Sequence, residues 1–361
     1  MKTIVVDFSN LNDLSGFGEI ARSYAPRLSK AAEELQDMHF VFIVPEQHRG
    51  AFGRHIDYLS TRHLKREAKA YSAPIDLWHA THQQFHYRRR QKGTLQLLTV
   101  HDLNYLREKH GVHLWRHQLE MPWMIRQSHA VTVISEYVKH DIEQHVPFLN
   151  KELRVIYNGI SDVESLPRRC PSFVNDEHAP FFLCIGQVRE KKNIHTVVPM
   201  MRHFPHHKLY ICGANHWAYS DQIRSMIAPE DQDRIMLTGK ISDEEKCWLY
   251  AHADALLFPS RLEGFGIPVL EAMRFGTKVF SSRYSCLPEI CSTHASYWDD
   301  YSPEAMAQVV KAGLEGWSRD GEDALKAQAY SRSYNYERYT QQYIALYREL
   351  LKMPDSIKYG K

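Results

Sequence analysis

The most informative segment of the chain is ADALLFPSRLEGFGIPVLEAMRFGTKVFSS, residues 253–282. Its apolar opening predicts a buried strand that ends at Pro259, and a loop with two glycines follows. Pro268 stands where the first residue of a helix is expected, and Gly276 ends that helix before the next apolar run. A strand, a glycine loop and a helix in this order are typical of an α/β unit in a parallel sheet.

Two carboxylates of this segment, Glu263 and Glu271, are separated by seven residues. We expect Glu263 in the loop at the carboxyl end of the strand and Glu271 in the first turn of the helix. Ligands of open α/β sheets bind at the carboxyl ends of the strands. The backbone amides of Gly264, Phe265 and Gly266 are expected to face the same place, where glycines let a phosphate approach. Amides for an anion beside carboxylates for hydroxyl groups suit a sugar nucleotide.

The same alternation of short apolar runs and longer stretches with helical spacing extends over the rest of the chain. Most of the runs are continuous in Val, Ile, Leu and Phe, as expected when helices cover both faces of a parallel sheet. The pattern therefore predicts two doubly wound α/β halves. The expected strands are residues 3–8, 40–44, 75–80, 95–101, 130–135, 154–157, 181–186, 208–212, 234–238, 253–259, 278–281 and 296–298.

The alternation stops in SDVESLPRRCPSFVNDEHAP, residues 161–180, which has three prolines and no sustained period, so we expect a linker there. At 361 residues the chain exceeds the ~250–300 at which a single core stops growing. We expect a first domain over residues 1–165 and a second over 166–335. Residues 336–361 are expected to form an amphipathic helix that packs back on the first domain.

Composition excludes several classes of protein. Lys and Arg total 45 against 43 for Asp and Glu, which argues against a surface built to bind nucleic acid. No run of 18 apolar residues occurs, and the opening MKTIVVDFSN reaches Asp7 too early for a signal-peptide core, so we expect a cytoplasmic protein. The six cysteines form no CxxC pair, which favours reduced thiols over a disulfide frame or a zinc site.

A basic loop follows the first strand of the second half. The sequence QVREKKN places Arg189, Lys191 and Lys192 at the carboxyl end of that strand. Fixed cations there would stabilise the negative charge that develops on a departing diphosphate. The alternative is a solvated turn of basic residues.

A glycine loop, Gly16-Phe17-Gly18, follows the first strand of the chain and opens a helix. With Ala21 it also satisfies the dinucleotide fingerprint GxGxxA. In a dinucleotide fold the first glycine follows the strand almost at once, whereas SNLNDLS intervenes here. This spacing disfavours a nicotinamide enzyme.

Several histidines are expected at strand ends. LLTVHDLNYL places His101 and Asp102 at the end of a buried strand, and WHATH places His79 and His82 at the end of another. We expect His101 and Asp102 on the edge that faces the cleft, and His79, His82 and Asp102 near an acceptor, with a structural role as the alternative for the histidines. The run at residues 88–90, three arginines, either meets an acidic acceptor or a membrane surface or is a solvated loop.

The second half resembles the retaining glycosyltransferases of the GT-B fold in the large group called family 4. The resemblance rests on FPSRLEGFGIPVLEAM with its E-x7-E spacing, on IGQVREKKN before it and on SCLPEI after it. It implies two Rossmann-like domains facing a central cleft, the first for the acceptor and the second for a nucleotide-sugar donor. By this resemblance Glu263 lies near the transferred sugar, Glu271 binds the ribose and Lys192 binds the diphosphate.

The resemblance also assigns roles in the first half. Gly16 and Gly18 correspond to the loop that closes over the phosphates, and His101 to a catalytic-site histidine near the donor sugar or the reaction centre. This chain has Gln187 where the family often has an arginine, so Arg189 or Lys191 is expected to supply the second cation.

The sequence thus predicts a metal-independent, retaining hexosyltransferase that needs no cofactor. Its expected donor is a nucleotide-diphosphate sugar, GDP-mannose or a UDP-sugar, and its acceptor a saccharide or lipid-linked glycan in the synthesis of cell-surface polysaccharide or lipopolysaccharide. Peripheral contact with the inner face of the membrane is an expectation of the same kind. Two alternatives stay open, a sugar-nucleotide epimerase of GT-B architecture and a non-catalytic nucleotide-sugar-binding protein.

Overall fold

The computed structural model describes residues 1–13, 16–83, 93–108, 111–146, 149 and 151–353, and the chain divides into two compact units. Unit 1 consists of Met1–Ser161 and Tyr334–Lys361, and unit 2 of Asp162–Ser333. The expected boundaries, at 165 and 335, lie a few residues further along the chain. Residues 354–361 of the expected terminal segment lie outside the described residues.

The sheet of unit 1 has seven parallel strands within the described ranges, in the order β3-β2-β1-β4-β5-β6-β7. Six of them overlap the expected strands, and β3 was not expected. The strands are β1 (Lys2–Asp7), β2 (Met38–Val44), β3 (Asp57–Ser60), β4 (Leu77–Ala80), β5 (Leu95–Val100), β6 (Ala130–Val133) and β7 (Leu153–Val155).

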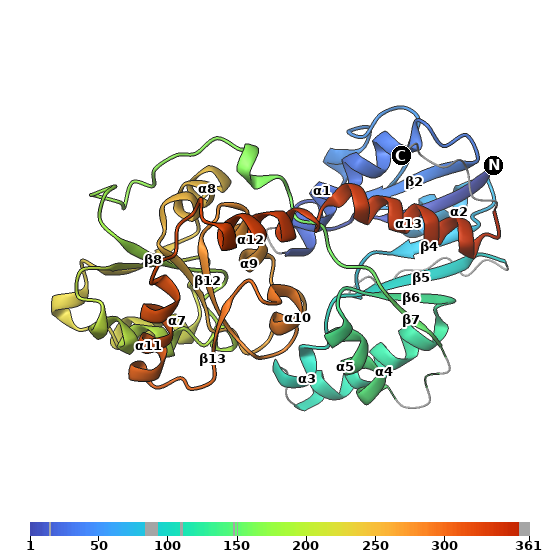
Figure 1. Cartoon of the computed structure of the whole chain (residues 1–361). Helices are drawn as coiled ribbons and strands as arrows, with labels where there is room; N and C mark the ends of the chain where they lie inside the picture. The colour runs from blue at the N-terminus through green and yellow to red at the C-terminus, as the bar shows by residue number, and fades with distance from the viewer. Residues whose placement is uncertain (14–15, 84–92, 109–110, 147–148, 150, 354–361) are drawn as a thin grey trace. The chain divides into compact units, whose positions relative to one another are not determined.

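Helices pack on this sheet, and the last one comes from the far end of the chain. Helix α13 (Tyr336–Leu350) contacts α1 (Gly16–Ala32), and Figure 1 shows α13 beside the blue strands of unit 1. Four tyrosines of α13, at positions 336, 339, 343 and 347, belong to the core of the unit. The other helices are α2 (Leu64–Ala70), α3 (Tyr105–Glu108), α4 (Gly111–Gln127) and α5 (Glu136–His145), with the 3-10 turn η1 (Glu46–His48).

Unit 2, every residue of which is described, has a six-stranded parallel sheet in the order β10-β9-β8-β11-β12-β13. Its strands are β8 (Phe181–Ile185), β9 (Lys208–Cys212), β10 (Ile235–Gly239), β11 (Ala255–Phe258), β12 (Lys278–Ser282) and β13 (Ser296–Trp298). Its helices are α6 (Val197–Met200), α7 (Ala218–Ser225), α8 (Asp243–His252), α9 (Ile267–Arg274), α10 (Leu287–Cys291), α11 (Pro303–Leu314) and α12 (Glu322–Arg332). Its 3-10 turns are η2 (Val163–Ser165), η3 (Glu190–Lys192), η4 (Ile194–Thr196), η5 (Met201–His203) and η6 (Pro229–Asp231).

Each sheet has one point at which the strand order reverses, as in doubly wound folds. In unit 1 this point lies between β1 and β4, and in unit 2 between β8 and β11. Because the loops that leave two such strands diverge to opposite faces, a crevice opens at their carboxyl ends. The loops after these four strands are therefore the places to look for a site.

The expected linker is largely part of unit 2. The carboxylate of Glu164 pairs with Arg274 at 3.1 Å and with Arg332 at 3.0 Å, and the backbone N–H of Arg169 donates to the carbonyl of Glu244. The chain crosses between units after Ser161 and again before Tyr334. These crossings are neighbours, because the N–H of Ile160 donates to the carbonyl of Tyr334 at 3.1 Å.

Two further expectations concern the whole chain. All six cysteines are free thiols, five of them buried. Among the described helices, none combines the length and the apolar character needed to cross a bilayer.

Candidate active site

Lys192 and Glu263, which come from two separate motifs, meet at the switch point of unit 2. Lys192 ends the turn η3 after β8, and Glu263 lies in the loop after β11. Lys192 Nζ lies 2.6 Å from Glu263 Oε1, and each side chain is only 14% exposed. At this low exposure, water screens the attraction less than it does at the protein surface.

Neighbouring groups fix the direction of both side chains. Ser260 Oγ donates to Glu263 Oε1 at 2.6 Å, and the backbone N–H of Glu263 donates to Ser285 Oγ at 3.1 Å. The ammonium of Lys192 lies 4.9 Å from the centre of the Phe258 ring, where a cation–π attraction adds to the ion pair. Ser260 and Ser285 were not predicted as site residues, because they lie in separate loops, after β11 and after β12.

Two glycines leave room for the Lys192 side chain and for the loop that carries it. Gly186 has φ +126°, and a Cβ there would lie 3.3 Å from Cε and Nζ of Lys192. Gly213 has φ +141°, and a Cβ there would lie 2.0 Å from the carbonyl oxygen of Gly186. Larger residues at these positions would displace the loop that carries the lysine.

The other two basic residues of the loop have different surroundings. The guanidinium of Arg189 lies 5.5 Å from the centre of the Trp217 ring. The carbonyl of Lys191 accepts a hydrogen bond from the N–H of Arg261 at 2.7 Å and lies 3.2 Å from Ser260 Oγ, whose shorter hydrogen bond goes to Glu263. Lys191 therefore joins the loop after β8 to the loop after β11 through its backbone.

Glu271 lies in the second turn of α9, not in the first turn as predicted, because the helix begins at Ile267. The residue is 2% exposed. Its Oε1 accepts from Lys246 Nζ at 2.8 Å and its Oε2 from the hydroxyl of Tyr250 at 2.9 Å, so α8 fixes its orientation. Each carboxylate oxygen still has a lone pair for a further donor such as a ribose hydroxyl.

The glycine-rich turn before α9 is tightly packed. Gly266 has φ +93°, and a Cβ there would lie 2.8 Å from Leu287 Cδ2. The side chain of Phe265 is buried in unit 2, while Gly264 is partly exposed. The side chain of Phe265 therefore has almost no surface for a donor. The predicted donor contact of this residue concerns its backbone amide.

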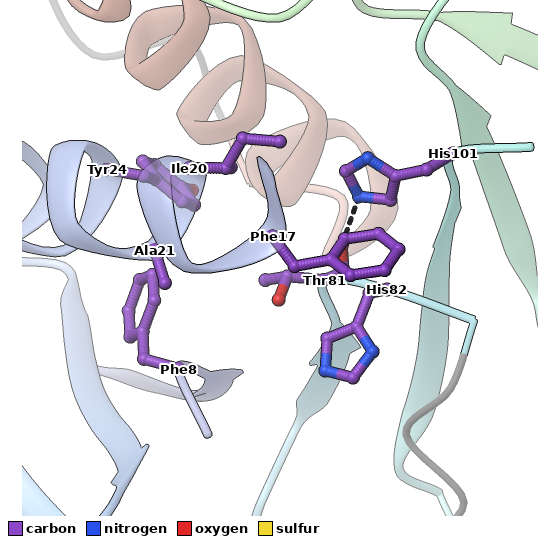
Figure 2. Close-up of a pocket in the computed structure, with 8 residues that line it drawn as sticks. All are labelled: Phe8, Phe17, Ile20, Ala21, Tyr24, Thr81, His82 and His101. Carbon is purple, nitrogen blue, oxygen red and sulfur yellow. Dashed lines mark hydrogen bonds between the residues drawn. The ribbon is translucent and has the colours of Figure 1, made fainter. Parts of the chain in front are cut away.

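A pocket lies at the switch point of unit 1, where α1 begins and the loops after β1, β4 and β5 meet (Figure 2). Phe17 lies between two histidines, with its ring centre 4.9 Å from that of His101 and 5.5 Å from that of His82. The pocket is lined by Phe8, Phe17, Ile20, Ala21, Tyr24, Thr81, His82 and His101.

His101 is a neutral, oriented imidazole. Its Nε2–H donates to the carbonyl of Thr81 at 2.8 Å, which leaves Nδ1 as the acceptor nitrogen. Burial lowers the pKa of His101 to about 4, and the nearby His82 contributes in the same direction. At neutral pH the ring therefore carries no charge.

His82 pairs with a carboxylate that the sequence analysis did not single out. His82 Nε2 lies 3.0 Å from Oδ2 of Asp7, which is fully buried at the end of β1. The other oxygen of Asp7 accepts from the N–H of Ser9 at 2.9 Å. Asp102, by contrast, stabilises a turn, because its Oδ1 accepts from the N–H of Asn104 at 3.0 Å.

The structure contradicts the acceptor contact expected for His79. His79 is fully buried, with Nδ1 2.7 Å from the hydroxyl of Tyr347 and Nε2 2.8 Å from Thr99 Oγ1. Its ring stacks on that of Tyr343 at 4.8 Å. The side chain faces the α13 side of the sheet and is a core residue with no surface for a ligand.

The arginine run at residues 88–90 lies outside the described residues. Within the described ranges, no three His, Cys, Asp or Glu side chains gather in a way that could hold a metal ion.

Comparison with known proteins gives a family to each unit. Residues 20–164 match the model of Glycosyltransferase Family 4, and residues 171–333 match that of Glycosyl transferases group 1. The O-antigen chain mannosyltransferase RfbU of Salmonella typhimurium is 27% identical over 60% of this chain and 60% of its own length. The lipopolysaccharide core biosynthesis mannosyltransferase LpcC of Rhizobium leguminosarum is 30% identical over 49% of this chain and 51% of its own. The matched region thus spans 60% or less of these relatives.

Solved structures share the fold over nearly the whole chain. Sucrose-phosphate synthase from Thermosynechococcus elongatus superposes with a TM-score of 0.75 at 17% identity, covering 98% of this chain and all of that one. Anabaena HepE, solved with UDP and glucose, gives 0.70 at 14% identity over 97% of this chain and all of its own. With one family model on each unit and this two-sheet fold, the chain belongs to the GT-B glycosyltransferases that join a Family 4 domain to a group 1 domain.

Proposed function

We propose that this protein is a retaining glycosyltransferase that moves a hexose from a nucleotide-diphosphate donor to a saccharide or lipid-linked glycan, without a metal ion. The observation that carries the proposal is the Lys192–Glu263 pair at the switch point of unit 2. That point lies within the part of the chain that matches the group 1 family. An ammonium and a carboxylate at one switch point suit a substrate with a diphosphate at one end and a sugar at the other.

In the proposed reaction, Lys192, Glu263 and Glu271 of unit 2 have separate roles. The bond from the anomeric carbon to the diphosphate oxygen breaks, and Lys192 stabilises the negative charge left on the diphosphate. The acceptor oxygen bonds to the same face of the anomeric carbon and gives its proton to the departing phosphate oxygen. Glu263 stabilises or orients the sugar, and Glu271, held by Lys246 and Tyr250, accepts from the ribose.

The relatives suggest the substrate. RfbU and LpcC are named as mannosyltransferases of O-antigen and lipopolysaccharide core synthesis. We therefore propose GDP-mannose as the first donor to test, and a growing lipopolysaccharide or other cell-surface glycan at the cytoplasmic face of the inner membrane as the acceptor.

A donor screen tests this proposal. GDP-mannose, UDP-, ADP- and CMP-sugars are compared by thermal shift, because a ligand that binds the native state raises the unfolding temperature. Transfer of labelled sugar to a saccharide acceptor is then followed, and NMR gives the anomeric configuration of the product. We expect the configuration of the donor to be kept and EDTA to leave the rate unchanged.

The two alternative functions give different outcomes in the same assay. An epimerase would act on the sugar nucleotide without any acceptor, and a binding protein would show the thermal shift without turnover. Release of nucleoside diphosphate that depends on an acceptor supports transfer. An inverted product would contradict the proposed mechanism.

A further inference from the structure

Helix α4 presents a row of large apolar side chains to solvent. Val112 is 78% exposed, Trp115 64%, Leu119 54% and Trp123 49%. Successive members are three or four residues apart, so they share one face of the helix. We name these four residues the α4 stripe.

The α4 stripe lies on the side of the helix away from the core. The buried residues of α4 are Met121, Met124 and Ile125, which helical spacing places largely opposite the stripe. In the part of α4 at residues 111–120 no side chain is buried. A helix normally turns its apolar stripe inward, so this outward stripe indicates a surface that a partner covers.

Positive charge accompanies the stripe. Arg116 and Arg126 lie on the same side of the helix by spacing, and both are exposed. Arg116 also pairs with Glu120 at 2.6 Å, and the ammonium of Lys151 binds the carbonyls of Ile125 and Arg126 at the end of the helix. The first turn of α4 has no acidic residue.

This combination fits an anionic lipid surface. Tryptophan favours the boundary between headgroups and acyl chains, and amphipathic helices with arginine beside their apolar face lie in that plane. A second copy of the chain fits less well, because a two-fold interface through the stripe would bring the arginines of both copies together.

We infer that α4 is an interfacial helix that docks unit 1 on a bilayer containing anionic lipid. The stripe enters the headgroup boundary, while Arg116 and Arg126 bind lipid phosphates. The inference deepens the proposed function by assigning its membrane contact to a surface, and vesicle binding is measured without sugar transfer, so the two proposals fail separately.

The test uses the full chain and unilamellar vesicles. Binding is measured by flotation with phosphatidylcholine vesicles that contain phosphatidylglycerol and with vesicles of phosphatidylcholine alone. The double variant Trp115→Ser/Trp123→Ser is expected to lose at least ~10-fold in affinity for the anionic vesicles, and Arg116→Gln/Arg126→Gln a similar factor. Leu119→Ser keeps the test open if the double tryptophan variant does not fold.

The chain offers a matched control for that leucine. Leu325 lies on α12 and is 54% exposed, the same fraction as Leu119. Leu325→Ser is expected to bind vesicles as the parent protein does, whereas Leu119→Ser binds more weakly. Equal binding by all variants, or no binding by the parent, overturns the inference. A parent protein that is dimeric, together with a double tryptophan variant that is monomeric, also overturns the inference, because a second copy of the chain would then cover the stripe.

Discussion

Lys192 is the residue in which the candidate site can be tested most directly. Its ammonium has a carboxylate partner, Glu263, and an aromatic neighbour, Phe258, so the side chain is held ready in one direction. In the proposed function a bound diphosphate is a second anion for this ammonium. The lysine would then be a fixed charge that needs little reorganisation when the leaving group departs.

Replacement of Lys192 by alanine is expected to lower kcat by at least ~100-fold, because the charge on the leaving diphosphate is then uncompensated. Lys326→Ala is the matched control, since Lys326 is an exposed lysine of α12 that pairs with Glu322 at 2.6 Å. Transfer of labelled sugar at saturating donor measures both variants. Full activity of Lys192→Ala would remove the lysine from the mechanism.

Burial of His79 is expected to make the free energy of unfolding depend on pH. Burial lowers its pKa to about 3, whereas an unfolded chain has a histidine pKa near ~6.5. Between these values the unfolded state binds the proton more tightly, so the free energy of unfolding falls as the pH drops below ~6.5 and is constant above it. At pH ~5 the loss from this residue is about 2 kcal/mol.

Urea unfolding at neutral and mildly acidic pH measures this effect. His79→Gln is expected to be less stable at neutral pH but to show a weaker dependence on pH. His178→Gln, which removes an exposed histidine of unit 2, should behave as the parent does. His101, whose pKa burial lowers to about 4, adds a loss of the same sign that His79→Gln leaves in place.

The sequence indicated much of the site at this scale, but not its contacts. Lys192 and Glu263 stand in motifs that mark strand ends, and the strand order then brings them together. Ser260 and Asp7 were missed, because an isolated serine or a strand-end aspartate has no spacing that marks it. His79 was misplaced because neighbouring strand residues face opposite sides of the sheet, and the sequence around it does not determine which side is which.

At the scale of elements, the packing at the start of α1 requires a glycine at position 18 but not at position 16. A Cβ at Gly18 would lie 1.8 Å from the carbonyl oxygen of Asp13, whereas one at Gly16 has no neighbour within 4 Å among the described atoms. Arg22 fastens the same loop, because its Nη1 donates to the carbonyls of Asp13 and Leu11. The loop before α1 is thus packed against the helix at Gly18.

Gly18→Ala is expected to destabilise unit 1 by about 1–3 kcal/mol, the usual cost of an overpacked site. It should also reduce kcat/KM, because the start of α1 carries Phe17 into the pocket. Gly16→Ala changes the same motif without a clash, so the stability of unit 1 should change little. Unfolding curves measure the stability of both variants, and initial rates measure their kcat/KM. Equal destabilisation by the two substitutions would contradict the packing argument.

The elements themselves were largely predictable from apolar runs, and the exceptions have physical reasons. Strand β3 was missed because Asp57–Ser60 is a short edge strand in which only Leu59 and Ser60 are buried. The segment expected as a linker has no periodicity, yet its Glu164 and Arg169 bind the rest of unit 2 through scattered ion pairs and hydrogen bonds. Such contacts leave no repeating pattern in a sequence.

For the whole molecule, the return of the chain to unit 1 has a measurable effect. Tyr343 and Tyr347 of α13 reach Thr99 and His79 in the sheet of unit 1, and α13 also packs on α1. A chain that ends at Ser333 is expected to lose the stability of unit 1 while unit 2 still unfolds cooperatively.

Hydrogen exchange read by mass spectrometry measures the two units separately. In the shortened chain the amides of β1, β4 and β5 should lose protection, and those of β8 and β11 should keep it. A control chain that ends at Met353 retains α13 and should resemble the parent. Equal loss of protection in both units would show that their stabilities are not separable.

The discontinuous make-up of unit 1 also has a consequence for synthesis on the ribosome. Unit 2 is one uninterrupted segment, so all of it is translated before the last helix of unit 1 is made. The sheet of unit 1 is made first, but the helix that covers it is made last. The apolar surface that the α13 tyrosines bury therefore stays uncovered while unit 2 is translated. Unit 1 is therefore the part of the nascent chain that we expect to expose apolar surface for longest, because its covering helix is translated last.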